Sequence, residues 1–204
     1  MANAPIADPR LEGQCLVSQR VRSAYDTTSY AGRYGQGMVE SFSSDVTLDH
    51  VTLQASGNSG LYCDNVSMRV TYGQVSHNAA YGLYWNGVDP AVPLVVSDTT
   101  FSGNGAAGWL HFRDAAGTVT LERNAAAGGK NGFRADGRLN QGSLAWNNGD
   151  GLPLLVSGGL TIAPATTLAL KPGSVVKFAD YYDVLVVQGR LDAQGTAEMW
   201  LDVT

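Results

Sequence analysis

The chain has 204 residues, of which 44% are hydrophobic and only 15% are charged, and its formal net charge is -5 at pH 7. This content is enough to bury one substantial core, so a single domain over residues 1–204 is the simplest prediction. No run of Lys or Arg offers the clustered positive face that phosphate binding needs, which argues against a nucleic-acid partner. No stretch reaches the about 20 apolar residues of a membrane span.

The first segment, residues 1–15, has neither the basic start nor the apolar core of a secretory signal. We interpret it as a lead-in or cap that precedes the repeats. Two origins of the chain fit this beginning: a cytosolic protein, or a mature or excised segment to which Met1 was added for expression. We favour the second, which places the protein outside the cell or on a cell surface.

Residues 16–151 contain a repeat in which a glycine is followed by a large apolar residue, at intervals of 19 to 26 residues. A period in this range is typical of a solenoid whose coils stack on one another. Short β-branched runs such as Val46-Thr47-Leu48 predict strands, and no segment keeps helical spacing for three turns. The repeated steps are Gly37-Met38, Gly60-Leu61, Gly82-Leu83, Gly108-Trp109, Gly132-Phe133 and Gly151-Leu152.

Superposition of these glycines gives columns of equivalent residues whose character alternates. The positions seven and twelve residues before the glycine are nearly all apolar, as at Leu53 and Val75, and we expect them to face inward. The position ten residues before it holds no aliphatic residue and is expected to face water. This outward column consists of Thr27, His50, Tyr72, Asp98, Glu122 and Gln141.

Asparagine precedes the glycine by four residues in several of these coils, as from Asn78 to Gly82-Leu83 and from Asn104 to Gly108-Trp109. Asn tolerates left-handed backbone angles and its amide can bond the next coil, so we expect turns with stacked amides. The Asn-x-x-x-Gly-apolar step resembles the right-handed parallel β-helix repeat family, the superfold of the pectate lyases. Over about residues 16–150, this resemblance implies an all-β, right-handed parallel β-helix of about eight coils. It carries little information about function.

Residues 152–204 have a different sequence pattern, because the repeated Gly-apolar steps stop there. The stretches KPGSVVKF at residues 171–178 and VQGRLDAQGT at residues 187–196 are similar to segments of large bacterial surface β-helix proteins. We interpret this part as a continuation of the same helix with longer, flatter strands; a second domain is the alternative. The final residues read as an open strand without a polar cap, so we expect this end to continue into or pack against further β-helix.

The first candidate site is aromatic. Tyr62 and Tyr84 occupy the position two residues after the glycine in adjacent coils, and Trp85 lies next to them. Aromatic faces with polar edges suit sugar rings, so these three residues predict a surface that binds a polysaccharide or a cell-surface glycan. A ladder that only stabilises the sheet is the competing interpretation. The 26-residue interval also contains a loop, residues 86–93, that could add to such a site.

The second candidate is the carboxylate pair of Asp98 and Glu122, expected in one outward column of adjacent coils. Two carboxylates at that distance could share a proton, act as an acid and a base, or bind calcium. Calcium prefers six to eight oxygen ligands, and only two can be placed here, so no metal or other cofactor is predicted. A solvated pair that faces water is the competing interpretation.

The third candidate is a basic cluster that includes His111, Lys130 and Arg134. Polysaccharide lyases of the resembled family use a Lys, Arg, Tyr or His as base and a basic group to neutralise the uronate carboxylate. The paired aspartates and the Gly-His-Gly step of the polygalacturonases are absent. The glycine register places His111 in the column of Cys63 and Trp85, so a hydrogen-bonded histidine that points inward is the competing interpretation.

These observations favour a non-catalytic β-helix module of an extracellular or surface protein, which serves in adhesion, as a scaffold, or in carbohydrate binding through one flat face. The regular repeat, the low charge and the lack of a catalytic signature support this hypothesis. The alternative is a lyase or hydrolase that acts on acidic polysaccharide, since the fold hosts both classes. A segment of a phage tail fibre or spike is a third hypothesis.

Overall fold

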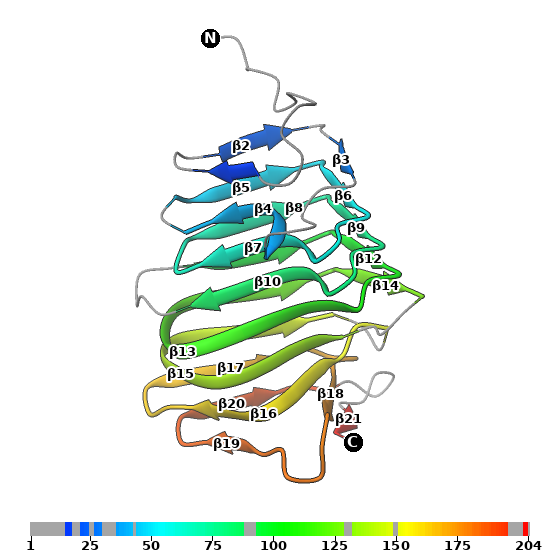
Figure 1. Ribbon diagram of the computed structural model, residues 1–204. Helices are drawn as coiled ribbons and strands as arrows, with labels where there is room; N and C mark the ends of the chain where they lie inside the picture. Colours follow the sequence, from blue (N-terminus) through cyan, green and yellow to red (C-terminus); the bar gives the residue numbers. More distant parts are fainter. Residues whose placement is uncertain are drawn as a thin grey trace.

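The computed structural model describes residues 15–17, 21–24, 27–29, 36–42, 44–87, 93–128, 132–148, 151–195 and 202–203. Every regular element among them is a β-strand, and the strands pair in parallel. They stack along one axis into a solenoid (Figure 1). This confirms the expected all-β parallel β-helix, with a number of turns close to the eight predicted. The described part of the chain contains no helix that could cross a membrane.

The first face of the solenoid is a ladder in which each strand pairs with the equivalent strands of the neighbouring coils. Two of its strands are long enough to bend and continue onto the second face. In order, the ladder consists of β1 (Cys15–Val17), β4 (Gly37–Ser41), β7 (Ser59–Asp64), β10 (Tyr81–Gly87), β13 (Ala106–Glu122), β15 (Phe133–Asn147), β16 (Leu154–Ile162), β18 (Val175–Phe178) and β21 (Asp202–Val203).

Two further faces close the coil. The second face holds β2 (Val21–Ala24), β5 (Val46–Asp49), β8 (Met68–Thr71), β11 (Leu94–Ser97), the second halves of β13 and β15, then β17 (Thr166–Leu170) and β20 (Arg190–Ala193). β19 (Leu185–Val187) pairs with the second half of β16. The third face is a separate sheet of β3 (Thr27–Ser29), β6 (Thr52–Gln54), β9 (Gln74–Ser76), β12 (Thr100–Ser102) and β14 (Ala125–Ala127).

Alternation along each strand decides which side chains fill the core. In β5 and β8, every second residue is buried, because successive side chains point to opposite sides of the sheet. Parallel pairing in register then stacks the inward residues of successive coils, as in the fully or almost fully buried column of Leu48, Val70, Val96, Leu121 and Trp146. The core is therefore a set of continuous apolar columns along the axis.

The turn from the second to the third face has the same backbone conformation in four successive coils. His50, Tyr72, Asp98 and Arg123 all have φ between 52° and 54°, the left-handed region that non-glycine residues seldom adopt. Their backbone N–H groups donate to the carbonyl oxygens of the next coil, so the inter-coil hydrogen bonding continues through the turn. The side chains at this turn point outward in one column.

Buried asparagines stack at two turns of the coil. The backbone N–H and the Nδ2 of Asn78 lie 3.0 and 2.9 Å from Asn104 Oδ1, and the backbone N–H of Ser56 donates to Asn78 Oδ1 at 3.0 Å. Asn124 makes the same two contacts with Asn148 Oδ1, at 3.0 and 3.1 Å. The predicted amide stacking is confirmed at Asn78 and Asn104. The second stack was not expected, because Asn124 precedes no Gly-apolar step.

The glycines of the repeat do not all share one column. Gly60 and Gly82 are equivalent, but the pairing of β10 with β13 puts Ala107, and not Gly108, opposite Gly82. Gly108 instead lies at an inward position beside Phe133, where an added Cβ would come within 2.2 Å of the Phe133 Cε1. A large side chain in the next coil thus requires glycine here. Columns of the first face that pass through this coil are displaced by one residue from the sequence prediction.

Residues after 151 continue the same solenoid, since β16 pairs directly with β15 and with β18. The expected longer strands are wrong for this part. The longest strands are β13 with 17 residues and β15 with 15, whereas the later strands have at most nine. Length arises where a strand bends around a corner without a break, as β13 and β15 do.

Candidate functional site

The outward side of the first face presents one ladder of large side chains. The strand pairing aligns Tyr62 of β7 with Tyr84 of β10, Trp109 of β13 and Arg134 of β15. Tyr62 and Tyr84 are the members that the sequence predicts for this column. The position two residues after Gly108 is Leu110, but Leu110 is fully buried, and Trp109 joins the column instead because of the one-residue displacement.

The aromatic rings of this ladder pack against one another. Tyr62 and Tyr84 are stacked, with ring centroids 4.8 Å apart and planes 8° from parallel, and Trp109 meets Tyr84 edge-on at 5.3 Å. Tyr81, at the start of β10, lies 5.4 Å from Trp109 in a tilted arrangement. The tyrosine pair therefore shares its facing ring surfaces internally and offers a ligand its edges and hydroxyl groups.

Burial controls the ionisation of these hydroxyl groups. Desolvation raises the pKa of Tyr84 to about 12, and nearby carboxylates and Tyr62 add to the shift. The pKa of Tyr62 is also raised, mainly by desolvation and then by Asp64 and Glu40. Both phenols are therefore neutral at physiological pH, where each can donate as well as accept a hydrogen bond.

Arg134 completes the ladder and is held by two contacts. Its guanidinium carbon lies 5.4 Å from the centroid of Trp109, a cation–π arrangement, and its Nη2 donates to Ser157 Oγ at 2.6 Å. Its Nε is buried and has no hydrogen-bond partner among the described residues. Arg134 is thus a positioned cation at one end of an aromatic row.

Trp85 does not belong to this surface. Its side chain is 0% exposed, its Nε1 donates to the carbonyl oxygen of Val66 at 3.2 Å, and its ring meets Phe112 edge-on in the core. The prediction that Trp85 contacts a ligand is therefore wrong. The reason is alternation: Tyr84 points outward, so its neighbour in the strand must point inward.

A second outward column runs two residues further along the same strands. It consists of Asp64, Asn86, His111 and Asp136, which the pairing aligns. The Oδ1 of Asp136 accepts a hydrogen bond from Trp109 Nε1 at 2.8 Å and lies 2.8 Å from His111 Nδ1. Asn86 Nδ2 donates to Asp64 Oδ1 at 2.7 Å. The column links its members into two hydrogen-bonded pairs.

His111 therefore faces outward, and its expected inward position beside Cys63 and Trp85 is wrong. The inward column contains Leu110, and the side chain of His111 is 31% exposed. If Nδ1 donates to Asp136, the Nε2 of the neutral ring is left as an acceptor toward solvent. The arrangement holds one imidazole in a fixed orientation beside the aromatic ladder.

A groove adjoins the ladder on the side of Tyr81 and Arg134. It has a volume of about 450 Å³, and most of its lining residues are small, so that the backbone is accessible along its floor. Tyr81 and Arg134 are the two large polar side chains on its walls. The lining consists of Ala79, Ala80, Tyr81, Gly105, Ala106, Gly132, Arg134 and Leu155. A ligand in this groove would contact one aromatic hydroxyl and one cation.

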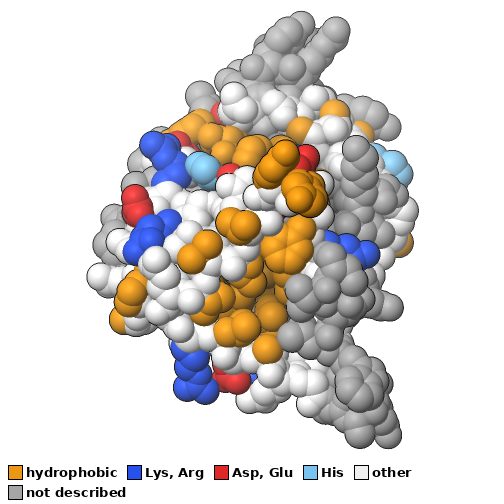
Figure 2. Space-filling view, turned by 90° about the horizontal axis from the view of Figure 1, so that it is seen from below, with side chains coloured by type: hydrophobic (Ala, Val, Ile, Leu, Met, Phe, Trp, Pro, Cys, Tyr) orange, Lys and Arg blue, Asp and Glu red, His pale blue; other side chains and the backbone are white. Residues whose placement is uncertain are grey.

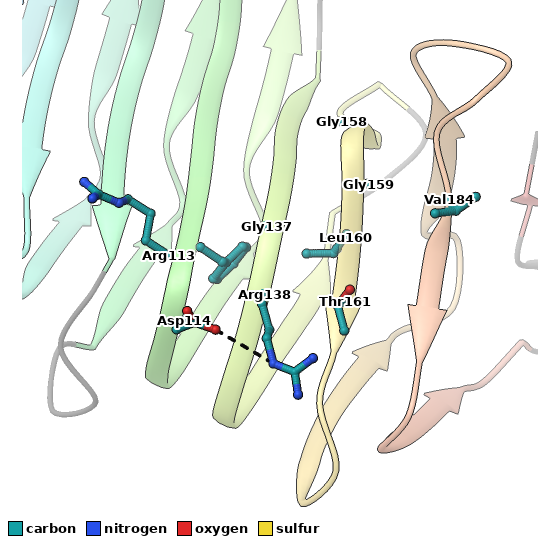
Figure 3. Close-up of a pocket in the computed structure, with 10 residues that line it drawn as sticks. Arg113, Asp114, Gly137, Arg138, Gly158, Gly159, Leu160, Thr161 and Val184 are labelled. Carbon is teal, nitrogen blue, oxygen red and sulfur yellow. Dashed lines mark ion pairs between the residues drawn. The ribbon is translucent and has the colours of Figure 1, made fainter.

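A larger depression of about 620 Å³ lies at the other end of the same strands (Figure 3). Gly158 and Gly159, at the bend of β16, leave it open, and Arg138 lies 3.8 Å from Asp114 at its edge. Figure 3 shows Arg113 directed away from this ion pair, toward the earlier coils. The depression adds positive charge next to the column that holds His111.

Asp98 and Glu122, the expected carboxylate pair, lie in different columns, and the side chain of Arg123 contacts both. Glu122 pairs with Ser97, so it is not in the column of Asp98, whose neighbour in the next coil is Arg123. Arg123 binds Asp98 with two hydrogen bonds of 2.8 Å and lies 2.8 Å from Glu122 Oε1. These hydrogen bonds lower the pKa of Asp98. The expectation that Asp98 and Glu122 lie in one column is therefore wrong, and both carboxylates contact one guanidinium.

Lys130 lies outside the described residues, as do residues 88–92 of the loop expected to extend the aromatic surface. Among the residues that the structure describes, no group of three or more His, Cys, Asp or Glu side chains is arranged to hold a metal ion.

Sequence reasoning did not identify Trp109, Tyr81 and Asp136. A signal was present, because Trp109-x-His111-x-Arg113 and Arg134-x-Asp136-x-Arg138 both alternate with period two. Alignment of the repeats on Gly108 shifted this coil by one residue, so the pattern did not line up with the neighbouring coils.

Comparison of the chain with known proteins finds no matching family model, no matching curated protein and no matching solved structure. The functional argument depends on the geometry of the first face.

Proposed function

We propose that the protein is a non-catalytic β-helix module of the extracellular or cell-surface kind, which binds carbohydrate with its first face. The observation that supports this proposal is the half-buried outward row of Tyr62, Tyr84, Trp109 and Arg134 over four adjacent coils. Neutral phenol hydroxyl groups can donate and accept hydrogen bonds, and a guanidinium can donate them, so both suit the hydroxyl groups of a sugar. Equivalent residues of adjacent coils are about 4.8 Å apart, close to the repeat of an extended sugar chain.

The groove beside Tyr81 gives this proposal a place for a sugar ring. The faces that Tyr62 and Tyr84 share are closed to a ligand by their stacking, whereas Tyr81 and Arg134 border an open volume of about 450 Å³. A ring inserted there would meet the hydroxyl of Tyr81, the guanidinium of Arg134 and a floor of small residues. The ladder would then extend contacts along a longer chain.

The test is binding to a glycan array, followed by affinity electrophoresis with the glycans that bind. We expect Tyr81→Ala and Trp109→Ala to weaken binding at least about tenfold, which corresponds to about 1.4 kcal/mol. Tyr72→Ala is the matched control, because Tyr72 is an exposed aromatic residue at the turn between the second and third faces. Equal affinity of Trp109→Ala and the control would reject the first face as the binding surface.

The hydrogen-bonded pair of His111 and Asp136 supports a second candidate, an enzyme that acts on acidic polysaccharide. With Nδ1 engaged by Asp136, the Nε2 of His111 could accept the proton from the carbon next to a uronate carboxylate. The bond to the leaving oxygen would then break, and a double bond would remain in the product. Arg134 is the nearby cation for the carboxylate, since both it and His111 pack against Trp109.

Absorbance of unsaturated uronate products distinguishes this candidate from a binding module. A lyase would produce the signal on at least one polyuronate, and His111→Asn would abolish it while glycan binding persists. His50→Asn is a matched control, because His50 also lies beside an aspartate, Asp49, but at a turn far from the ladder. No product from any polyuronate would rule out the lyase.

A further inference from the structure

The outward column of the first face continues past Arg134 and changes character there. The strand pairing aligns Arg134 with Leu155 of β16 and Lys177 of β18. Lys177 is exposed, and Leu155 is half-buried and lines the groove beside Tyr81. We call Arg134, Leu155 and Lys177 the basic section of the column. The column thus presents aromatic rings over three coils and then a cation, an apolar side chain and a second cation.

The two cations of the basic section have no acidic partner. Elsewhere on the solenoid, Arg123 contacts two carboxylates at 2.8 Å each. Among the residues that the structure describes, no carboxylate forms an ion pair with Arg134 or Lys177. The buried Nε of Arg134 also lacks a hydrogen-bond partner there. Both cations can therefore form charge-assisted hydrogen bonds with an anionic group of a ligand.

The surroundings of Arg134 show on which side an anionic ligand fits. Asp136 lies in the column two residues further along the strands, and its carboxylate already contacts Trp109 and His111. On the other side of Arg134, none of the described residues that line the groove is acidic. A view along the axis shows basic side chains at the rim of the solenoid, around hydrophobic side chains in the middle (Figure 2). An anionic chain therefore fits outside the solenoid, on the groove side of the column.

The spacing of the two cations indicates how often such a chain carries negative charge. Equivalent residues of adjacent coils are about 4.8 Å apart, so Arg134 and Lys177, two coils apart, are separated by about 9.6 Å along the axis. An extended sugar chain advances by close to one coil spacing per sugar, so the cations match anionic groups on every second sugar. A chain with charge on every sugar would place one charge over Leu155, which has no donor group. Side chains on one face of an extended peptide repeat at about 6.8 Å, which fits neither one coil nor two.

We infer that the basic section binds a linear glycan that carries a carboxylate or sulfate group on every second sugar, with its chain parallel to the solenoid axis. The acidic sugars contact Arg134 and Lys177, and the neutral sugar between them lies against Leu155. The chain then continues over the aromatic row. This inference rests on the proposed binding of carbohydrate by the first face, and it adds the class of glycan.

The first experiment measures, by calorimetry at a fixed ionic strength, the affinity for glycans that differ in charge. Hyaluronan carries a carboxylate on every second sugar and κ-carrageenan a sulfate on every second sugar, and each is compared with its uncharged derivative, made by carboxyl reduction or desulfation. We expect at least one of the two to bind about tenfold more tightly than its uncharged derivative and than polygalacturonate, which has a carboxylate on every sugar. The glycan that does so identifies the anionic group. Equal affinity within both matched pairs, or tighter binding of polygalacturonate, would overturn the inference.

Single substitutions test whether these two cations cause the preference. Arg134→Gln and Lys177→Gln should each weaken binding of the preferred glycan about tenfold. Arg69→Gln and Lys171→Gln are the matched controls, because both residues are exposed cations outside this column. Circular dichroism spectra that match the unsubstituted protein would show that the variants fold. Equal losses in the controls would indicate attraction by overall charge and contradict a site at the basic section.

A shift of charge tests the spacing. The double variant Leu155→Lys/Lys177→Gln keeps the net charge and brings the second cation one coil closer to Arg134. It should therefore bind polygalacturonate more tightly than the alternating glycan. A preference that stays with the alternating glycan would show that the distance between the cations does not select the ligand.

Trp109→Ala separates this inference from the proposed function on which it rests. If Trp109→Ala weakens binding of charged and uncharged glycans alike while Arg134→Gln and Lys177→Gln weaken neither, the first face binds carbohydrate and the charge pattern is wrong. If no glycan binds, both proposals fail. A single-stranded oligonucleotide that binds as tightly as the preferred glycan, and loses affinity in the same two variants, would overturn the assignment of the basic section to a glycan.

Discussion

The middle coils, residues 44–148, and the later coils, residues 151–195, share one strand ladder but differ in what surrounds it. The middle coils have a third face and buried asparagine stacks at their turns. The last described strand of the third face is β14, and the later coils end in residues that are only partly covered. An apolar residue at an inward position therefore becomes a core residue only when a coil lies on both sides of it. The alternation of apolar residues along a strand does not by itself bury them.

The largest expected effect that tests this comparison is a difference in unfolding free energy between substitutions at two leucines of one column. Leu168→Ala should cost about 3 kcal/mol of unfolding free energy, because it removes a fully buried side chain between two coils. Leu191→Ala should cost about 1 kcal/mol or less, since nearly half of this side chain is already exposed. Urea denaturation measures both free energies of unfolding. Equal costs would contradict the proposal that burial decides what each leucine contributes.

The asparagine stacks should contribute a smaller amount. Asn78→Ala would leave the buried N–H of Ser56 without its acceptor and would remove the side-chain hydrogen bond from Asn78 Nδ2 to Asn104 Oδ1, which should cost about 2 kcal/mol. Asn140→Ala is the control, because Asn140 is exposed on β15 and accepts only a long bond from Arg138. Thermal unfolding compares the two variants. If the asparagine stack only fills space, Asn78→Ala would lower the stability no more than Asn140→Ala does.

The smallest effect concerns the exposed turn of Asp98 and Arg123. The pKa of Asp98 is lowered below its ordinary value of 3.8 by the hydrogen bonds from Arg123. The stability from this pair is thus fully present above pH 3.8 and disappears as pH falls through the lowered pKa. Asp98→Asn should therefore be slightly less stable than the unsubstituted protein near neutral pH and equally stable at strongly acidic pH. A difference that persists in acid would point to another cause.

The sequence predicted the fold well and the site in part. Short alternating strands with a period of 19 to 26 residues were enough to predict a parallel β-helix, and Tyr62 and Tyr84 were placed in one outward column that the pairing confirms. Trp85 was assigned to the outward side although it follows the outward Tyr84, and His111 was assigned to the inward side because the register of its coil is displaced by one residue. A displacement of one residue reverses the side of every residue that follows, since the side chains of a strand alternate.

Gly108 and Arg123 show why the one-residue changes of register could not be predicted from the sequence repeat. Gly108 looked like the other repeated glycines, yet it occupies the next column, because the ring of Phe133 fills the space where its side chain would be. Arg123 lies beside Asp98 because the backbone at the turn is left-handed in each coil. Both facts depend on contacts between residues about 25 positions apart.

The sequence by itself determined that this chain forms stacked strands, because period, alternation and turn residues are local properties that each coil repeats. Only the tertiary structure decided which side chains meet, since that depends on the register between coils. It brought Trp109, Arg134, His111 and Asp136 together on one face. Register is set by packing in the core, where one glycine opposite one phenylalanine can displace a column.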